Sequence, residues 1–402
     1  MRQTTTPLPQ LIYPRVINLR RRLQDLIYTP ISAEVKNAQT NLESKSNDTS
    51  TANVAIFVGP VHKEYIPWED AITETLEPIH VGDSFSPASF VSSQDGSEGV
   101  KEFPWTQRWF RIDVHILESG EQTQLLDQEQ QQQQQQQHDQ CEYCLYFLAH
   151  GEFTIYTTEG RVWCGIDPCH SHIPLSSLLQ QQTQDQKGGR RQISCTLWLD
   201  GGQYQTGFWF GLQPPTEELG FRLLKVQLQR KNNLAYATYH DLSMLIEWVE
   251  YMYEREGIPL NTENGYYQPL ISVSPCLRRV LYLLNQSCDG YDQTKTLASL
   301  QVGLQSIYQQ FTTSSRDMKI CHVGHAHMDL VWLWPERVTY QKIVHTYSNV
   351  LQLMNKYPQF TFTMSQPPLY YHILEKQPEL AARISERIEN GQWEFTGALE
   401  VV

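Results

Sequence analysis

Hydrophobic residues near the start of the chain recur with a helical period. Within residues 15–28, Val16, Leu19, Leu23 and Ile27 stand three or four positions apart, so their side chains share one face of a helix. This spacing predicts a short amphipathic helix. Residues 32–52 are polar and poor in aromatic residues, which is typical of a flexible connector.

The pattern changes to short apolar runs between residues 54 and 240. These runs are rich in β-branched and aromatic residues, and Gly, Pro, Asn and Asp separate them. The strand-like segments are NVAIFVG, RWFRIDVHIL, CLYFLAHGEFTIYTT, SCTLWLD, TGFWFGL and GFRLLKVQLQR. Several short strands separated by turns, without a helical period, predict an antiparallel β-sandwich.

Two glutamine-rich stretches interrupt this region, at residues 121–140 and 180–192. Their composition cannot supply a packed core. We therefore expect both stretches to be insertions at the tips of loops, and the sequence assigns them no function.

A helical period returns from residue 241. The segment DLSMLIEWVEYMYEREG predicts a helix that ends near Gly257. A second helix begins at Ser274 and Pro275, a capping residue followed by a first-turn proline, and TKTLASLQVGLQSIYQQF predicts a third. These helices are expected to connect the sandwich to the part that follows.

The final segment, residues 318–402, alternates between strand and helix patterns. MKICHVG predicts a strand, 335–357 a helix, 359–366 a strand, 378–391 a helix, and 392–402 the opening of a third strand. This order implies parallel strands joined by right-handed crossovers, as at the start of an α/β barrel or a layered sheet. In such folds the chemistry gathers at the carboxyl ends of the strands.

The pattern as a whole predicts a multidomain α+β protein with four segments. They are an N-terminal helix and flexible connector (1–53), an antiparallel β-sandwich with Gln-rich loop insertions (54–240), a helical connector (241–317), and the truncated start of a parallel β/α barrel-like domain (318–402).

Composition narrows the class of partner and the compartment. Hydrophobic residues make up 40% of the 402 residues, enough for more than one core, and the net charge of −13 argues against a nucleic-acid or anionic-membrane partner. No run approaches the roughly 20 apolar residues of a membrane span, and the N-terminus lacks the apolar core of a secretory signal. Together with eight scattered cysteines, these features predict a soluble, cytoplasmic protein.

Two clusters of cysteine and histidine invite a metal-site interpretation. Cys141 and Cys144 form a lone CxxC pair without a second pair, so the sequence favours ordinary core or surface cysteines. The stretch CGIDPCHSH, residues 164–172, contains further possible ligands, but the proline within it and its β-rich flanks favour ordinary loop residues. Those possible ligands are Cys164, Cys169, His170 and His172.

The segment VGHAHMDLVWLWP, residues 323–335, carries the strongest chemical signal. Residues two apart on an extended chain point the same way, so His327 and Asp329 can converge on one cation. A solvated strand end followed by a helix start is the alternative for this pair. Trp332 and Trp334 could offer an apolar face to a sugar, or they could pack in the core.

The motif GHAHMDLVWLWP closely resembles the first conserved motif of the family 38 α-mannosidases, especially their cytosolic and vacuolar branch. LQLMNKYPQFTFTMSQ and RIENGQWEFTGALEVV are similar to the continuation of that family's catalytic domain. Upstream, VGDSFSPASF, RWFRIDV and GIDPCHSHIPL resemble the N-terminal sandwich of the same branch. The resemblance is strong after residue 318 and weaker before residue 240.

This resemblance implies a metal-dependent, retaining exo-glycosidase that releases terminal α-D-mannose from oligosaccharides. It places the metal ligands on His327 and Asp329 and a mannose-packing residue on Trp332. Zinc is the implied ion, with cobalt also accommodated. His325 would then support the site without binding the ion. The segment ERVTYQK, residues 336–342, departs from the cytosolic branch and leaves the sugar subsites open.

The resemblance also implies that essential residues lie outside these 402. The family's nucleophile is an aspartate just after the segment resembling GALEVV, so it is expected just past Val402, and Glu400 is not placed to replace it. The general acid and the remaining metal-binding histidine are expected further on. We therefore expect this chain to be an incomplete part of the enzyme and to be inactive alone.

Two other classes remain open. A metal-dependent amidohydrolase would use both His325 and His327 after a first barrel strand, and a non-catalytic carbohydrate-binding protein would use the sandwich alone. A vacuolar location and a homo-oligomer are also compatible with the sequence.

Overall fold

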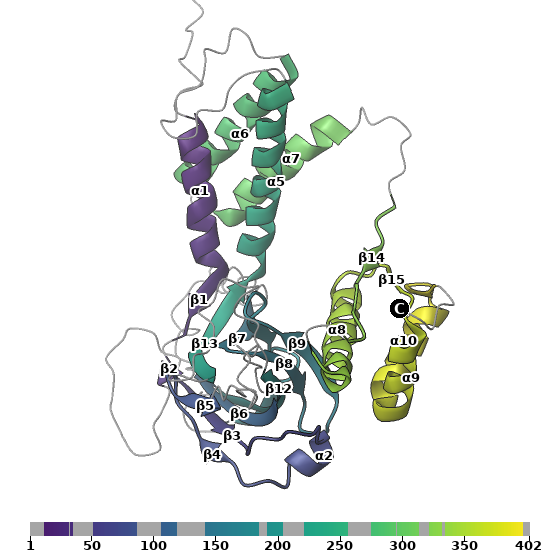
Figure 1. The fold of residues 1–402 in the computed structure, drawn as a ribbon. Coiled ribbons are helices and arrows are strands. Elements are labelled where there is room, and N and C mark those ends of the chain that lie inside the picture. Colours follow the sequence, from purple (N-terminus) through teal and green to yellow (C-terminus); the bar gives the residue numbers. More distant parts are fainter. Residues whose placement is uncertain are drawn as a thin grey trace, which may run out of the picture. The chain divides into compact units, whose positions relative to one another are not determined.

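In the computed structural model the chain folds into two compact units (Figure 1). Unit 1 is mainly helical and combines Met1–Pro30, Leu126–Tyr143 and Gln229–Lys319; unit 2 contains the remaining residues. The structure describes residues 12–31, 33–34, 51–86, 106–118, 141–184, 191–203, 221–255, 275–294, 296–312, 321–331 and 334–396.

In the described part of unit 1, four helices share an apolar core. They are α1 (Ile12–Ile27), α5 (Asn233–Arg255), α6 (Pro275–Thr294) and α7 (Leu297–Thr312). Val16, Leu19 and Leu23 of α1 are at most 3% exposed and pack against apolar residues of the other three helices. The three- and four-residue spacing of the sequence is therefore the buried face of α1.

An eight-stranded sheet forms the larger layer of unit 2. Its long central strands β6 (Thr106–Glu118) and β12 (Arg191–Gln203) pair antiparallel along their whole length. The order is β2 (Ala33–Glu34), β3 (Thr51–Val58), β6, β12, β8 (Glu152–Tyr156) and β9 (Val162–Ile166), with β4 (Glu77–Pro78) on β3 and β11 (Gln180–Gln184) on β12. Among the strand pairs described in this sheet, only the short pair of β2 and β3 is parallel.

A second sheet is ordered β1 (Tyr28–Pro30), β13 (Phe221–Asn232), β7 (Cys141–Ala149), β10 (His172–Pro174), with β5 (Ser84–Ser86) paired to β13. Aromatic rings from the two sheets meet inside unit 2. Phe147 of β7 lies edge-on to Phe110 of β6 and Phe153 of β8, with ring centroids 6.4 and 5.3 Å apart. Such edge-to-face pairs add to the free energy of apolar burial.

The chain passes from one sheet to the other at Gly151, between β7 and β8. Its φ of +119° disfavours any side chain, and a Cβ there would lie 2.7 Å from the Gly202 carbonyl oxygen. Glycine is therefore required at this crossing.

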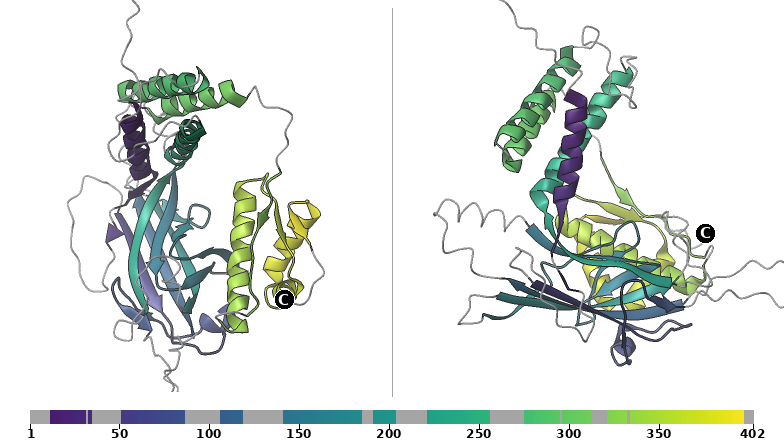
Figure 2. Two further views of the ribbon diagram at one scale, coloured as in Figure 1. Left: turned by 45° about the horizontal axis from the view of Figure 1, so that its top comes forward. Right: turned by 90° about the vertical axis from the view of Figure 1, so that its left-hand side faces the viewer.

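The C-terminal part of unit 2 contains three parallel strands and three helices (Figure 2). In chain order they are β14 (Gly324–His325), α8 (Glu336–Lys356), β15 (Phe362–Met364), α9 (Pro367–Lys376), α10 (Pro378–Glu389) and β16 (Trp393–Phe395). β14 pairs with β15 and β15 with β16, both in parallel. Trp393 and Tyr347 are almost fully buried and join one apolar cluster with Trp109, Tyr156 and Trp198 of the large sheet.

The antiparallel sheets, the helices of residues 241–312 and the parallel strands of the C-terminal part were predicted, and the structure confirms them. Two predictions were wrong in detail. α5 begins at Asn233, inside the region expected to be strand, and Gln180–Gln184 forms β11 instead of a loop tip. Backbone pairing with β12 stabilises a strand there despite the polar side chains. The segment TGFWFGL and residues 121–140 lie outside the described residues.

The C-terminal elements also differ from expectation. β14 covers Gly324 and His325, so residues 321–323 are not strand although the apolar run predicted a strand over 318–324; residues 318–320 lie outside the described residues. A helix that the pattern did not predict, α9, begins at Pro367 and Pro368. Proline is tolerated in the first turn because no helical partner is lost there.

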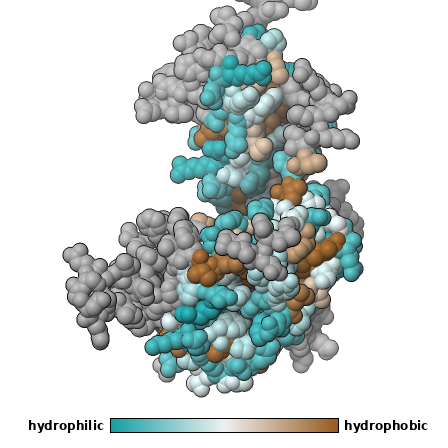
Figure 3. Space-filling view, turned by 45° about the vertical axis from the view of Figure 1, so that its right-hand side comes forward, coloured by the Kyte–Doolittle hydropathy of each residue, from teal (hydrophilic) through white to brown (hydrophobic). Residues whose placement is uncertain are grey.

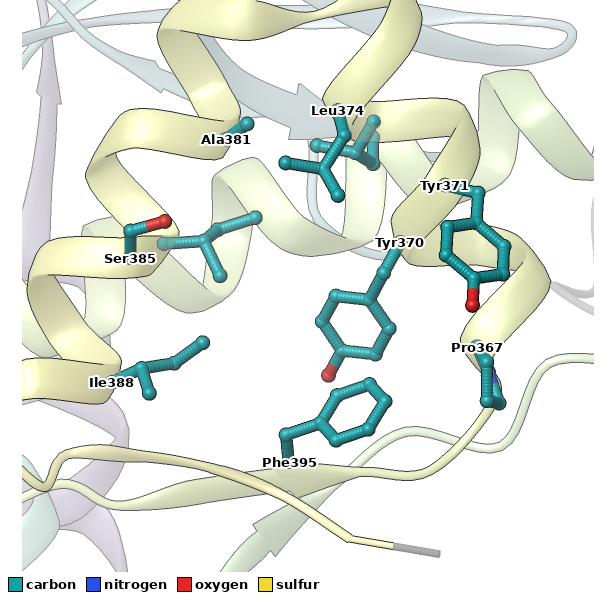
Figure 4. A pocket seen from close by; sticks show the side chains of 10 residues that line it. Pro367, Tyr370, Tyr371, Leu374, Ala381, Ser385, Ile388 and Phe395 are labelled. Carbon is teal, nitrogen blue, oxygen red and sulfur yellow. The ribbon is translucent and has the colours of Figure 1, made fainter. Parts of the chain in front are cut away.

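The surface of the larger unit carries separate apolar patches (Figure 3). Side chains of α9, α10 and β16 line a cavity of about 240 Å³, into which Tyr370 and Phe395 project (Figure 4). Tyr371 and Leu374 at its rim are 62% and 59% exposed. Among the described residues, no helix combines the length and the apolar character needed to cross a bilayer.

Candidate metal centre

The candidate ligands lie at the carboxyl end of the parallel sheet. His325 is the last residue of β14 and pairs with Thr363 of β15, and its Nδ1 lies 2.9 Å from the Thr363 carbonyl oxygen. His327 and Asp329 follow on the extended segment directly after β14. The motif therefore starts within the strand and continues past its end.

His327 and Asp329 approach each other as their spacing predicted. His327 Nε2 lies 3.1 Å from Asp329 Oδ1, and the two side chains are 74% and 36% exposed. Two donor atoms that each lie about 2.1 Å from one ion, at a tetrahedral or octahedral angle, are separated by roughly 3.0–3.4 Å. The pair thus fits two adjacent ligand positions of a divalent metal.

The described residues do not complete such a site. Among them, no group of three or more His, Cys, Asp and Glu side chains could hold a metal ion. Because a metal site in a protein needs at least three or four ligands, the pair requires ligands from elsewhere.

The segment that carries Asp329 is held by side chains of the two following helices. Thr339 of α8 is fully buried, and its hydroxyl donates a hydrogen bond to the Leu330 carbonyl oxygen. The same Oγ1 lies 3.5 Å from the Asp329 carbonyl oxygen. Gln366, in front of α9, donates to the Met328 carbonyl oxygen. Sequence reasoning missed Thr339 and Gln366, because no local pattern distinguishes them from other polar residues near a helix start.

Of the two tryptophans of the motif, Trp334 lies within the described residues. Trp334 is half-buried, its indole N–H donates to Thr339 Oγ1 at 2.9 Å, and Lys342 Nζ lies 5.0 Å from its ring centroid. Its ring is therefore turned towards α8. Trp332, the predicted sugar-packing residue, lies outside the described residues, as does Glu400.

The cysteine- and histidine-rich stretch at 164–172 folds as part of the sheets and a turn. Cys164 is buried in β9, where burial raises the pKa of its thiol to about 12. Asp167 closes the turn by accepting the backbone N–H groups of Cys169 and His170 at 2.7 and 2.8 Å. The stretch is thus accounted for by local structure.

Comparison with known protein families matches residues 317–401 to the N-terminal domain of glycosyl hydrolases family 38. The segment that contains the parallel strands is therefore identified as matching the N-terminal domain of family 38. The match covers β14, the His327–Asp329 pair and all three parallel strands, so it confirms the family to which the motif pointed.

The curated proteins that resemble this chain are alpha-mannosidases. It is 24% identical to alpha-mannosidase G of Dictyostelium discoideum over 353 residues, which are 87% of this chain and 27% of that protein. It is also 24% identical to alpha-mannosidase 2C1 of Homo sapiens over 349 residues, 85% of this chain and 27% of that protein. An alpha-mannosidase of Saccharomyces cerevisiae is 36% identical over 62 residues, 15% of this chain and 6% of that protein. The chain therefore spans about a quarter of the length of the first two relatives.

Proposed function

We propose that this chain is part of an α-mannosidase, a glycosidase that releases terminal α-D-mannose from oligosaccharides. The observation that carries the proposal is the 3.1 Å approach of His327 Nε2 and Asp329 Oδ1 at the carboxyl edge of a parallel sheet, inside the domain that matches family 38. The similarity to alpha-mannosidase G and alpha-mannosidase 2C1 supports the reaction and the substrate class.

His327 and Asp329 would hold a zinc ion, and their mixed nitrogen and oxygen donors would also accept cobalt. When bound, the metal would supply positive charge that binds sugar hydroxyls and favours a distorted, oxocarbenium-like ring. The chain's own contribution is to hold the two donor atoms side by side. His325 directs its Nδ1 to the Thr363 carbonyl, which fixes β14 against β15 next to the ligands.

Retaining hydrolysis requires a carboxylate nucleophile and a separate carboxylic acid close together. We propose that both come from parts of the protein beyond residue 402, with the nucleophile an aspartate just past Val402. Residues 1–402 alone would then bind metal weakly and hydrolyse no mannoside. Trp332 would pack against the mannose ring in the complete site.

We also propose a cytoplasmic location. The eight cysteines are scattered along the sequence, which suits a reducing compartment.

The test is the release of an aryl leaving group from an α-mannoside by the full-length protein, with and without a chelator. Chelation should abolish activity, and added zinc or cobalt should restore it. His327→Ala and Asp329→Ala should each lower kcat/KM by more than about 100-fold, because each removes a ligand. His322→Ala, at an exposed histidine in front of the same strand, is the matched control and should leave the activity unchanged.

His325→Ala separates this function from a metal-dependent amidohydrolase. An amidohydrolase would use His325 as a ligand, so this variant would lose its metal, whereas the mannosidase should keep its metal content. A full-length protein that hydrolyses amides instead of mannosides, or an active His327→Ala variant, would rule out the proposal.

A further inference from the structure

We propose that the Glu152–Lys342 ion pair positions the candidate metal centre. Through Trp334 and Thr339 the ion pair holds the backbone that carries Asp329. The large sheet, which contains Glu152, thus takes part in building the site. The role assigned to Asp329 rests on the proposed function, whereas the chain of contacts does not.

The ion pair joins the large sheet to α8. Lys342 Nζ lies 2.7 and 2.9 Å from the two carboxylate oxygens of Glu152, at the start of β8. The two side chains are only 14% and 15% exposed, so water screens the pair weakly. Loss of one partner would leave a poorly solvated charge behind.

The same ammonium group reaches the loop of the metal motif. Lys342 Nζ lies 5.0 Å from the centroid of the Trp334 ring, which places a cation near the aromatic ring. Because Glu152 binds the ammonium group through both oxygens, the position of the cation is set by the sheet. The ring of Trp334 is thereby held beside α8.

Trp334 transmits this position to the ligand segment. Its indole N–H donates to Thr339 Oγ1, and the Thr339 hydroxyl contacts the Leu330 and Asp329 carbonyl oxygens. Thr339 is 0% exposed, so its hydroxyl has no access to water as an alternative partner. The backbone on which the Asp329 carboxylate stands is therefore tied to α8 at the point where Trp334 is fixed.

The Glu152–Lys342 ion pair is not needed merely to attach the C-terminal helices to the large sheet, because other contacts already attach these helices to β9. Gln352 Nε2 donates to the Trp163 carbonyl oxygen at 2.8 Å, Asn349 Oδ1 accepts the Gly165 N–H at 2.9 Å, and Arg383 donates to the Val162 carbonyl oxygen at 2.8 Å. None of these three contacts includes a residue of the loop at 328–334. The ion pair differs from them in its second contact, with Trp334.

The test measures hydrogen exchange of the backbone amides of residues 328–331 and Trp334, the described part of the segment 328–334. Glu152→Gln and Lys342→Met should each make exchange in this segment about tenfold faster, because the Trp334 ring loses its fixed cation and no longer holds Thr339 against the Leu330 and Asp329 carbonyl groups. Lys342→Arg, which keeps the charge, should restore part of the protection. Gln352→Ala is the matched control: it removes another α8–sheet contact and should leave the exchange of 328–334 unchanged.

A second readout uses the full-length protein and competition with a metal chelator. Glu152→Gln should weaken zinc binding about tenfold while Gln352→Ala leaves it unchanged. Equal exchange of 328–334 in wild type and both ion-pair variants would overturn the proposal, as would an equal effect of Gln352→Ala. Because the exchange measurement needs neither metal nor activity, failure of the α-mannosidase function would be recognised separately.

Discussion

The carboxyl group of Asp200 is almost completely buried from solvent. It lies in β12, is 4% exposed, and accepts hydrogen bonds from Gln107 at 2.8 Å and from Gln341 at 3.2 Å, both on Oδ1. Burial raises its pKa to about 7, against the lowering effect of these two bonds. It borders a cavity of about 80 Å³ that Tyr65, Tyr156, Arg337 and His372 also line.

Asp200→Asn should stabilise the protein in a pH-dependent way. The unfolded carboxyl ionises near pH 4 and the folded one near 7, so the folded state binds more protons between these values and wild-type stability falls as pH rises through this window. Asparagine cannot ionise, so the melting temperature of the variant should gain on that of wild type as pH rises through this window, and the difference should be about 5 °C larger at pH 8 than at pH 4. Glu386→Gln, at an exposed position on α10, is the control for the removal of a carboxylate that is not buried. An equal effect at both pH values would contradict this assignment.

Close packing of β9 against α8 depends on one glycine. A Cβ at Gly165 would lie 2.4 Å from two ring atoms of His345, closer than real side chains approach. The missing side chain lets the helix approach the strand, and it also lets the Gly165 N–H reach Asn349. The packing of β9 against α8 therefore depends on the lack of a side chain at Gly165 as much as on hydrogen bonds.

Gly165→Ala should destabilise unit 2 by about 1–3 kcal/mol, because the added methyl group overpacks the contact. The measurement is urea unfolding of four proteins: wild type, Gly165→Ala, His345→Ala and the double variant. In the His345→Ala background the same glycine substitution should cost much less, since the ring is gone. Equal costs in both backgrounds would show that the His345 contact is not the cause.

At the scale of the whole molecule, the described residues form an apolar cluster within each of the two units. One cluster joins α1, α5, α6 and α7, and another joins the large sheet to the C-terminal helices and parallel strands. Separate cores allow separate opening, because the loss of one set of apolar contacts leaves the other set intact.

Leu304→Ala in α7 should therefore act on unit 1 alone. Leu304 is 0% exposed, and its truncation should cost about 2–5 kcal/mol. Hydrogen exchange should become faster in α1, α5, α6 and α7 while α8 and α10 keep wild-type protection. Val302→Ala, at a position of the same helix that is 66% exposed, is the control and should leave both units unchanged. A matching increase in α8 and α10 would show that the units unfold together.

Sequence reasoning was most accurate where the determining forces are local. The amphipathic spacing of α1 and α8 identified both helices, because a helix buries one face of its own period. The same holds for the candidate ligands. Alternation on an extended segment brings His327 and Asp329 together whatever the rest of the chain does, and the structure shows this approach.

Tertiary structure decided the features that need a distant partner. β14 is short because its pairing depends on β15, and a glutamine-rich segment became β11 because β12 offers it backbone hydrogen bonds. The contact of Glu152 with Lys342 spans 190 positions. No pattern within one segment contains such a contact.

The amino-acid sequence by itself determined the local elements, the similarity of residues 317–401 to family 38 and the approach of His327 to Asp329, because periodicity and a contiguous motif are properties of neighbouring residues. Only the tertiary structure decided what holds that pair in place: a buried threonine hydroxyl, an indole and a lysine fixed by a carboxylate of the N-terminal sheet. These groups act on one another only after folding has removed water and brought distant segments together, which is also why the pKa of Asp200 could not be predicted from its neighbours in the chain.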